Sequence, residues 1–259
     1  MRPIQTAGAF SWPELQTTDL DGASAFYSAV FGWEMQFMDM AMGKYGVGSL
    51  GESPVAGLHK GMEEDTPVNW SFYVTVTDVS ACLKKAEGLG ATVLVEPMNI
   101  PGVGRMGVFQ DPQGAVLSLM AYEDPEHEVH QSEHEASFGT PGAFSWFELR
   151  VPDAALAIDF YSTLFGWETS VMDMDMGAYH VISVGGANMG GIISVSPDEM
   201  PPHWGGYVTV ADAAVFVKNV GNAGGKVLYG PHEVPGVGHM VMFSDPQGGR
   251  LSGVQYGNA

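Results

Sequence analysis

The sequence predicts an α+β protein of four βαβββ units, with curved, mostly antiparallel sheets that carry helices on one side. Two observations predict this class. First, GAFSWPEL at 8–15 returns as GAFSWFEL at 142–149, a shift of 134 residues (142 − 8), and FYSAVFGWE at 26–34 returns at the same shift as FYSTLFGWE. Second, each half contains the order strand, helix, three strands twice. Solenoid repeats run about 20–50 residues, so this longer period indicates a duplicated domain.

The first unit opens with a strand at 9–16, in which the side chains at even positions share one face. Asp19 then precedes a helix whose apolar residues fall at helical spacing. The helix is predicted to end at Gly32, because glycine readily adopts the left-handed conformation of a helix cap. Glycines separate three short strands that follow, at about 34–40, 45–50 and 55–59.

The second unit repeats this order. Asp78 stands at the turn position that Asp19 has in the first unit, and a helix at 79–89 is predicted to end at Gly90. One strand precedes this helix, at 70–77, and three follow it, at 92–96, 106–110 and 115–122. The second half of the chain repeats both units.

The duplication predicts two domains, 1–122 and 141–259, joined by an acidic linker at 123–140. Each domain is long enough to bury a core of its own. The linker is polar and flanked by proline and glycine, which is typical of an exposed connection. Three histidines stand among its glutamates, His127, His130 and His134. A metal site on such a segment is not the favoured interpretation.

The charge balance excludes two classes of partner. The chain has 30 acidic and 10 basic residues, a net charge of −20, and this field repels nucleic acids and anionic membranes. No apolar run of about 18 residues predicts a membrane span, and the N-terminal residues lack the apolar stretch of a signal peptide. We therefore expect a cytoplasmic protein. Its one cysteine, Cys82, lies in an apolar helical stretch and is predicted to be a buried structural thiol.

Three motifs recur in both halves: FYSAVFGW after Asp19 and FYSTLFGW after Asp153, YVTVTD and YVTVAD, and DPQG before the last strand. With these motifs the chain resembles the vicinal oxygen chelate superfamily, which includes glyoxalase I, bleomycin-resistance proteins and extradiol dioxygenases. The resemblance covers both halves apart from the linker. It implies that βαβββ units pair into cup-shaped sheets whose concave faces hold a ligand, usually around a divalent metal.

The resemblance also implies three metal-ligand positions in each half, two histidines and a glutamate. In this chain these positions hold Trp12, Ser71 and Ser118 in the first half and Trp146, Gly205 and Ser252 in the second. Divalent cations need imidazole, thiolate or carboxylate ligands, so these residues predict that neither half holds the usual metal. We therefore expect no metal and no other cofactor.

Other residues are predicted to fill the cups. Glu14 shares a strand face with Trp12, and Glu148 with Trp146. Each glutamate could act as a general base, which makes Glu14 and Glu148 the candidate catalytic residues, or serve as a structural or simple ligand contact.

Methionines at strand spacing are a further candidate lining. Met40 and Met174 are the central members of two sets, Met38–Met42 and Met172–Met176. Thioethers could bind copper(I), line a flexible apolar pocket, or pack in the core beneath the helices.

The halves differ most in their histidines. His180, His203, His232 and His239 replace Gly46, Asn69, Met98 and Arg105. An alternative metal site could form in the second half, from Glu148 with His203 or His239. The PGVG loops that lead to Arg105 and His239 are predicted to lie over the mouths of the cups, so both residues, with His203, are candidate ligand contacts.

The favoured function is metal-free binding of a small apolar, aromatic or antibiotic-like molecule by residues of both cups. The alternative is a glyoxalase-like lyase, or a hydroxylase or oxygenase, with a relocated metal site or a glutamate base. A third interpretation is a scaffold that mainly contacts other proteins. Because four units in one chain can pair internally, we expect a monomer.

Overall fold

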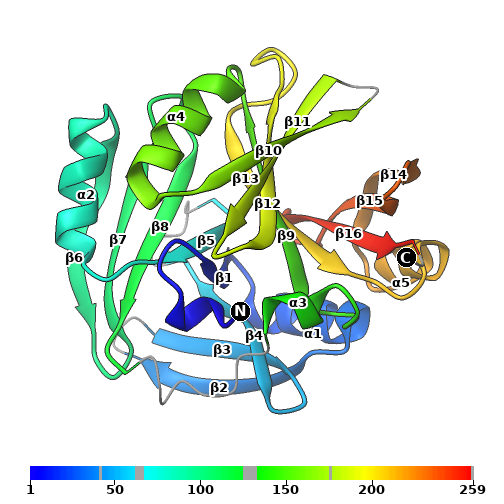
Figure 1. Cartoon of the computed structure of the whole chain (residues 1–259). Helices are drawn as coiled ribbons and strands as arrows, with labels where there is room; N and C mark the ends of the chain where they lie inside the picture. Colours follow the sequence, from blue (N-terminus) through cyan, green and yellow to red (C-terminus); the bar gives the residue numbers. More distant parts are fainter. Residues whose placement is uncertain (41–42, 62–66, 125–132, 175–176, 258–259) are drawn as a thin grey trace. The chain divides into compact units, whose positions relative to one another are not determined.

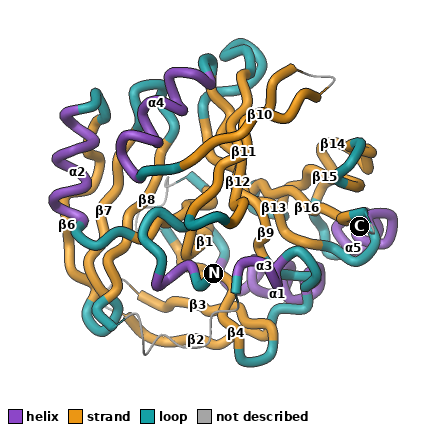
Figure 2. Tube along the Cα trace, in the orientation of Figure 1, coloured by secondary structure: helices purple, strands orange, loops and turns teal. Residues whose placement is uncertain are grey.

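The structure is a computed structural model that describes residues 1–40, 43–61, 67–124, 133–174 and 177–257. It confirms the predicted α+β class with two eight-stranded mixed sheets, one from each half of the sequence. Figure 1 labels the elements along the chain, and Figure 2 separates helices, strands and loops by colour. No helix in the described part of the chain is long and apolar enough to span a bilayer.

The first half follows the predicted order of elements. Its first unit is β1 (Phe10–Thr17), α1 (Leu20–Phe31), β2 (Glu34–Met40), β3 (Gly43–Leu50) and β4 (Ser53–Lys60). Its second unit is β5 (Asn69–Thr75), α2 (Val79–Gly88), β6 (Thr92–Ile100), β7 (Gly104–Gln110) and β8 (Val116–Tyr122). A short 3-10 helix, η1 (Pro3–Gln5), precedes them, and α3 (His134–Ser137) follows.

The second half repeats these elements. Its first unit is β9 (Phe144–Val151), α4 (Ala154–Phe165), β10 (Glu168–Met174), β11 (Gly177–Val184) and β12 (Ala187–Ser194). Its second unit is β13 (His203–Thr209), α5 (Ala213–Asn222), β14 (Lys226–Val234), β15 (Gly238–Ser244) and β16 (Arg250–Tyr256).

The strand order is the same in both sheets: β2-β3-β4-β1-β5-β8-β7-β6 and β10-β11-β12-β9-β13-β16-β15-β14. The hairpins β2–β3, β3–β4, β6–β7 and β7–β8 are antiparallel, whereas β1 runs parallel to β4 and β5 parallel to β8. Helix α2 packs on β6 and β7, and α5 packs on β14 and β15 (Figure 1).

Contacts along the chain define two compact units, and each combines segments of both halves. The first unit comprises Met1–Ser11, Ser71–Val129 and Trp146–Gly205. The second unit comprises Trp12–Trp70, His130–Ser145 and Gly206–Ala259. The domain boundaries expected from the duplication, 1–122 and 141–259, stay a prediction.

Aspartates begin the four long helices, as the turn positions in the sequence suggested. The carboxylate of Asp19 accepts the backbone N–H of Gly22 at 3.0 Å, and Asp78, Asp153 and Asp212 cap α2, α4 and α5 in the same way. Helix α1 ends at Gly32 with φ 75°, as predicted. Helix α2 ends one residue earlier than expected, since Leu89 caps it and Gly90 follows with φ 96°.

Each compact unit contains a buried tyrosine–aspartate pair. In the second compact unit, Tyr27 of α1 donates its hydroxyl to Oδ2 of Asp245 at 2.9 Å and accepts the indole N–H of Trp70 at 3.0 Å. In the first compact unit, Tyr161 of α4 donates to Oδ2 of Asp111 at 3.0 Å, and Trp204 donates to Tyr161. The tyrosines belong to the FYSAVFGW and FYSTLFGW motifs, and the aspartates to the DPQG turns. The motifs behind the family resemblance are therefore structural.

These pairs predict a loss of stability at alkaline pH. Burial, and secondly the charge of Asp245, raise the pKa of Tyr27 well above its ordinary value; burial and Asp111 do the same for Tyr161. Below about pH 10 both tyrosines are protonated whether the chain is folded or unfolded, and their contribution to stability is fully present. Above it, only the unfolded chain releases the protons.

We expect the free energy of unfolding to fall by about 1.4 kcal/mol per pH unit for each tyrosine above about pH 10. Denaturant titrations between about pH 9 and 11 measure this slope. The variants Tyr27→Phe and Tyr161→Phe should each reduce this slope by the contribution of one proton. Equal slopes in the unaltered protein and both variants would contradict the assignment.

Candidate functional site

The first cluster consists of Trp12, Glu14 and Tyr45, all half-buried. Trp12 and Glu14 lie two residues apart on β1, so their side chains share one face. The indole N–H of Trp12 donates to the hydroxyl of Tyr45 at 3.0 Å, and this hydroxyl donates to Oε2 of Glu14 at 2.7 Å. Tyr45 comes from β3, so the cluster connects an indole, a phenol and a carboxylate from two strands of one sheet.

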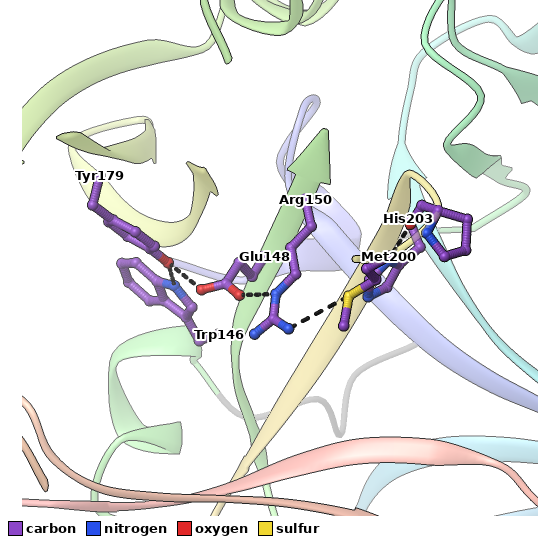
Figure 3. Close-up of polar contacts among 7 residues, drawn as sticks. Trp146, Glu148, Arg150, Tyr179, Met200 and His203 are labelled. Atoms are coloured by element: carbon purple, nitrogen blue, oxygen red, sulfur yellow. Dashed lines mark hydrogen bonds and ion pairs between the residues drawn. The ribbon is translucent and has the colours of Figure 1, made fainter. Parts of the chain in front are cut away.

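The second cluster, Trp146, Glu148 and Tyr179, repeats this arrangement on β9 and β11 (Figure 3). Trp146 donates to the Tyr179 hydroxyl at 2.6 Å, and Tyr179 donates to Oε2 of Glu148 at 3.0 Å. Tyr179 packs with Ile193 in a buried group, against which Trp146 also lies. The duplicated sequence therefore yields the same hydrogen-bonded triad twice.

A glycine on the intervening strand makes room for each tyrosine ring. Gly57 of β4 pairs with Glu14 in the register of the sheet, and a Cβ at position 57 would collide with the Tyr45 hydroxyl and lie 2.8 Å from Nε1 of Trp12. In the second half, Gly191 pairs with Glu148, and a Cβ there would collide with the ring of Tyr179. The two glycines are thus required by close packing and not by turn geometry.

The clusters differ in the basic side chain that faces the glutamate. In the first cluster, Nε2 of His59 lies 3.6 Å from Oε1 of Glu14. In the second, Nε of Arg150 donates to Oε1 of Glu148 at 2.7 Å. Each half has a neutral residue where the other carries its basic group: Ile193 aligns with His59, and Gln16 aligns with Arg150.

The guanidinium of Arg150 extends beyond the second cluster. Its Nη1 lies 3.7 Å from the sulfur of Met200, and a dashed line marks this contact in Figure 3. His203, at the start of β13, lies on the same side, with Nδ1 2.9 Å from the carbonyl oxygen of Pro201. His203 is therefore close in sequence and space to a group that contacts Arg150, although it does not belong to the triad.

The methionines divide between burial and exposure. Met40 is half-buried at the end of β2, and Met174 packs against the buried group that contains Tyr179. Met38 is 48% exposed and Met172 is 44% exposed, so core packing beneath the helices is wrong for these two residues. Both lie on edge strands, where only one neighbouring strand covers them. Met42 and Met176 lie outside the described residues.

Arg105 and His239 are exposed. Arg105 belongs to the first compact unit, whereas the first cluster belongs to the second compact unit. His239 belongs to the second compact unit, whereas the second cluster belongs to the first. Nη1 of Arg105 donates to Oδ1 of Asn99 at 3.0 Å, and Arg105 lines a surface groove with Leu83 and Lys84 of α2. His239 pairs across β14 and β15 with Glu233. Their predicted ligand contacts stay a prediction.

The residues at the implied metal positions do not fit a divalent cation. An indole nitrogen is a hydrogen-bond donor only, and both Trp12 and Trp146 use it to donate to tyrosine. Ser71, Ser118 and Ser252 offer neutral hydroxyls, and Gly205 has no side chain. Among the described residues, no three histidine, cysteine, aspartate or glutamate side chains are placed to hold a metal ion. His127 and His130 of the linker lie outside those residues, and His134 is buried.

The duplicated sequence also marks Tyr45 and Tyr179, which no strand pattern singles out. Both end the aligned segments MDMAMGKY and MDMDMGAY, 134 residues apart (179 − 45). Arg150 and His59 had a subtler signal, since each is a basic residue in one half where the other half is neutral. Gly57 and Gly191 align as well, and only the packing shows why.

Comparisons with known proteins agree with this fold in both halves. The model of the glyoxalase-like domain matches residues 14–120, and the model of the glyoxalase/bleomycin resistance protein/dioxygenase superfamily matches residues 143–252. CFP32 of Mycobacterium bovis, provisionally named a glyoxylase, is 31% identical over 251 residues, covering 95% of this chain and 94% of the relative. DnrV of Streptomyces peucetius, named an anthracycline biosynthesis protein, is 27% identical over 269 residues, covering 96% and 93%.

Solved structures show the same fold at low sequence identity. The 2,3-dioxygenase LapB from Pseudomonas sp. KL28 aligns with a TM-score of 0.67 at 12% identity, over 98% of this chain and 94% of that one. The Mn(II)-bound glyoxalase from Novosphingobium aromaticivorans aligns with a TM-score of 0.64 at 17% identity, over 97% and 85%.

Proposed function

The chain belongs to the glyoxalase/bleomycin resistance protein/dioxygenase superfamily, also called the vicinal oxygen chelate superfamily, and we propose that it binds small aromatic molecules without a metal. The ligand sites are the first cluster and the second cluster. Each offers a flat indole for stacking and a hydrogen-bonded phenol and carboxylate for polar groups of the ligand.

One observation carries this proposal. At the position where the superfamily usually has its first metal-binding histidine, each half has a tryptophan whose N–H donates to a tyrosine, and the tyrosine in turn donates to a glutamate. Such a triad holds aromatic rings in a fixed orientation, which favours recognition of a planar ligand. The name of the Streptomyces relative, an anthracycline biosynthesis protein, supports a polycyclic aromatic ligand.

The second candidate is an enzyme of the glyoxalase, hydroxylase or oxygenase type that uses a glutamate as a base. Glu14 is the better candidate for this role, since His59 at 3.6 Å gives it a neighbour able to exchange a proton. Glu148 accepts hydrogen bonds on both oxygens, from Tyr179 and Arg150, an arrangement suited to holding these donors. The solved neighbours are named a dioxygenase and a glyoxalase, and these names support an enzyme as the alternative.

Elemental analysis and ligand titration together test the proposal. Protein purified without chelators should contain no stoichiometric zinc, iron, manganese or nickel, and a neutral flat probe, 2-naphthalenemethanol, should quench its tryptophan fluorescence on binding. Replacing Trp12 with alanine removes a stacking surface and should cost roughly 1–3 kcal/mol of affinity at the first cluster.

Trp146→Ala tests the second cluster in the same way, and Trp33→Phe, a change in the buried core, is the control for general loss of structure. One metal ion per half in the purified protein would favour the enzyme. Unchanged affinity in both cluster variants would overturn the assignment of the sites.

A further inference from the structure

We propose that the two clusters discriminate ligands by charge: the first cluster prefers a cationic aromatic ligand, and the second prefers an aromatic ligand with an acidic group. This inference rests on the proposed function, because it assumes that both clusters bind ligands. It concerns the relative preference of the two sites, which is set by residues at aligned positions of the duplicated sequence.

The triads themselves are identical in residue type, so they cannot produce a difference. Two aligned positions beside the glutamates do differ. Position 16 is glutamine, whose side-chain amide donates to the carbonyl oxygen of Pro67 at 3.0 Å, whereas position 150 is arginine. Position 59 is histidine and position 193 is isoleucine. The second cluster therefore has one more permanent positive charge than the first at these positions.

This extra charge lies within the site. Nε of Arg150 is 2.7 Å from Glu148 and balances its carboxylate at contact distance. The guanidinium also has its Nη1 next to the Met200 sulfur at 3.7 Å. A thioether is a weak hydrogen-bond acceptor, and a carboxylate or phenolate oxygen of a ligand would be a stronger partner for the same donor.

In the first cluster the corresponding neighbour is an imidazole, which is charged only when protonated. Its Nε2 lies 3.6 Å from Oε1 of Glu14, farther than the 2.7 Å between Nε of Arg150 and Oε1 of Glu148. The side chains of His59 and Glu14 are 13% and 17% exposed, and those of Arg150 and Glu148 are 16% and 10% exposed. Restricted access of water strengthens the effect of a charge difference on a ligand in contact with either site.

Three probes with one ring system separate shape from charge: 2-naphthylmethylammonium, 2-naphthoate and the neutral 2-naphthalenemethanol. The two indole N–H signals of Trp12 and Trp146 report the sites separately in proton–nitrogen spectra of the full chain. Trp12→Phe and Trp146→Phe assign these signals. Titrations at one fixed pH and moderate salt reduce the general attraction of cations to an acidic protein.

We expect the ratio of cation affinity to anion affinity to be at least about tenfold higher at the Trp12 signal than at the Trp146 signal. The exchange variant Q16R/H59I should bring the first site toward the preference of the second, and R150Q/I193H should do the reverse. The measurement on the unaltered protein decides the question even if an exchange variant does not fold.

Each outcome has a distinct meaning. If the neutral probe shifts both indole signals and the charged probes rank alike at the two sites, the charge inference is overturned while the proposed function stands. If none of the three probes shifts either signal, the proposed function fails, and the inference fails with it.

Discussion

Asp245→Ala is expected to lower the free energy of unfolding by about 3–5 kcal/mol, a large share of the stability of an ordinary domain. Asp245 is 3% exposed. Its Oδ1 accepts the backbone N–H groups of Gln247 at 3.0 Å and Gly249 at 2.7 Å, and its Oδ2 accepts the hydroxyl of Tyr27. Alanine would leave three donors without this acceptor, two of them buried, and each buried donor costs about 1–3 kcal/mol when no other partner replaces the carboxylate.

Asp245→Asn should cost less than the alanine change. Burial raises the pKa of Asp245, so part of the benefit of its hydrogen bonds is offset by the desolvation of the carboxylate. Asparagine retains a carbonyl oxygen for the two turn amides, so these hydrogen bonds survive. It turns an N–H donor toward the Tyr27 hydroxyl, which already accepts from Trp70, so the buried O–H proton of Tyr27 loses its acceptor and part of the cost remains.

Guanidinium titrations and calorimetry measure these losses, and Asp198→Ala, at an exposed aspartate, is the matched control. A double-mutant cycle with Tyr27→Phe isolates the hydroxyl–carboxylate contact. If Asp245→Ala were no more destabilising than Asp198→Ala, the aspartate would not have the structural role that its contacts indicate. Asp111→Ala tests the equivalent pair with Tyr161 in the first compact unit.

The pairing of Tyr27 with Asp245 shows where prediction from sequence stops. The helix, its aspartate cap and its glycine end follow from local patterns around Asp19 and Gly32. The partner of Tyr27 does not, because both DPQG turns are alike and Asp111 is an equally good acceptor in the sequence. The duplication that reveals the two halves conceals which segments of them pack together. Only the folded chain shows that Tyr27 contacts Asp245 and Tyr161 contacts Asp111.

The candidate site is likewise only partly predictable from the sequence. Placing Trp12 and Glu14 on one face needs only the two-residue period of a strand. Including Tyr45 requires the order β3-β4-β1 and the register that sets Gly57 beside Glu14. That register depends on a parallel pairing between strands at opposite ends of a unit, which no local pattern specifies. The contribution of Arg150 to the second cluster likewise became apparent only from its contact with Glu148.

Gly57→Ala is expected to abolish or strongly weaken ligand binding at the first cluster, with a loss of affinity of at least about tenfold. The new methyl group would occupy the space of the Tyr45 hydroxyl and ring and would lie 2.8 Å from Nε1 of Trp12. Gly57 is not among the positive-φ glycines, so the backbone itself tolerates alanine. The effect therefore comes from displacing the two rings, at a cost of about 1–3 kcal/mol in stability.

Gly221→Ala is the matched control, since a Cβ there meets no atom within 4 Å and alanine in a helix is favoured over glycine by about 0.5–1 kcal/mol.

The double variant Gly57→Ala/Tyr45→Ala separates the loss of stability from the loss of ligand affinity. Removing the tyrosine relieves the collision and should restore stability, but it also removes the phenol that links Trp12 to Glu14, so ligand affinity should stay low. Gly57→Ala could instead bind 2-naphthalenemethanol as tightly as the unaltered protein does, while the ligand leaves the Trp12 indole signal unshifted. In that case the triad would not be the binding site. A loss of affinity that the double variant fully recovers would show that Tyr45 is dispensable and that the indole alone holds the ligand.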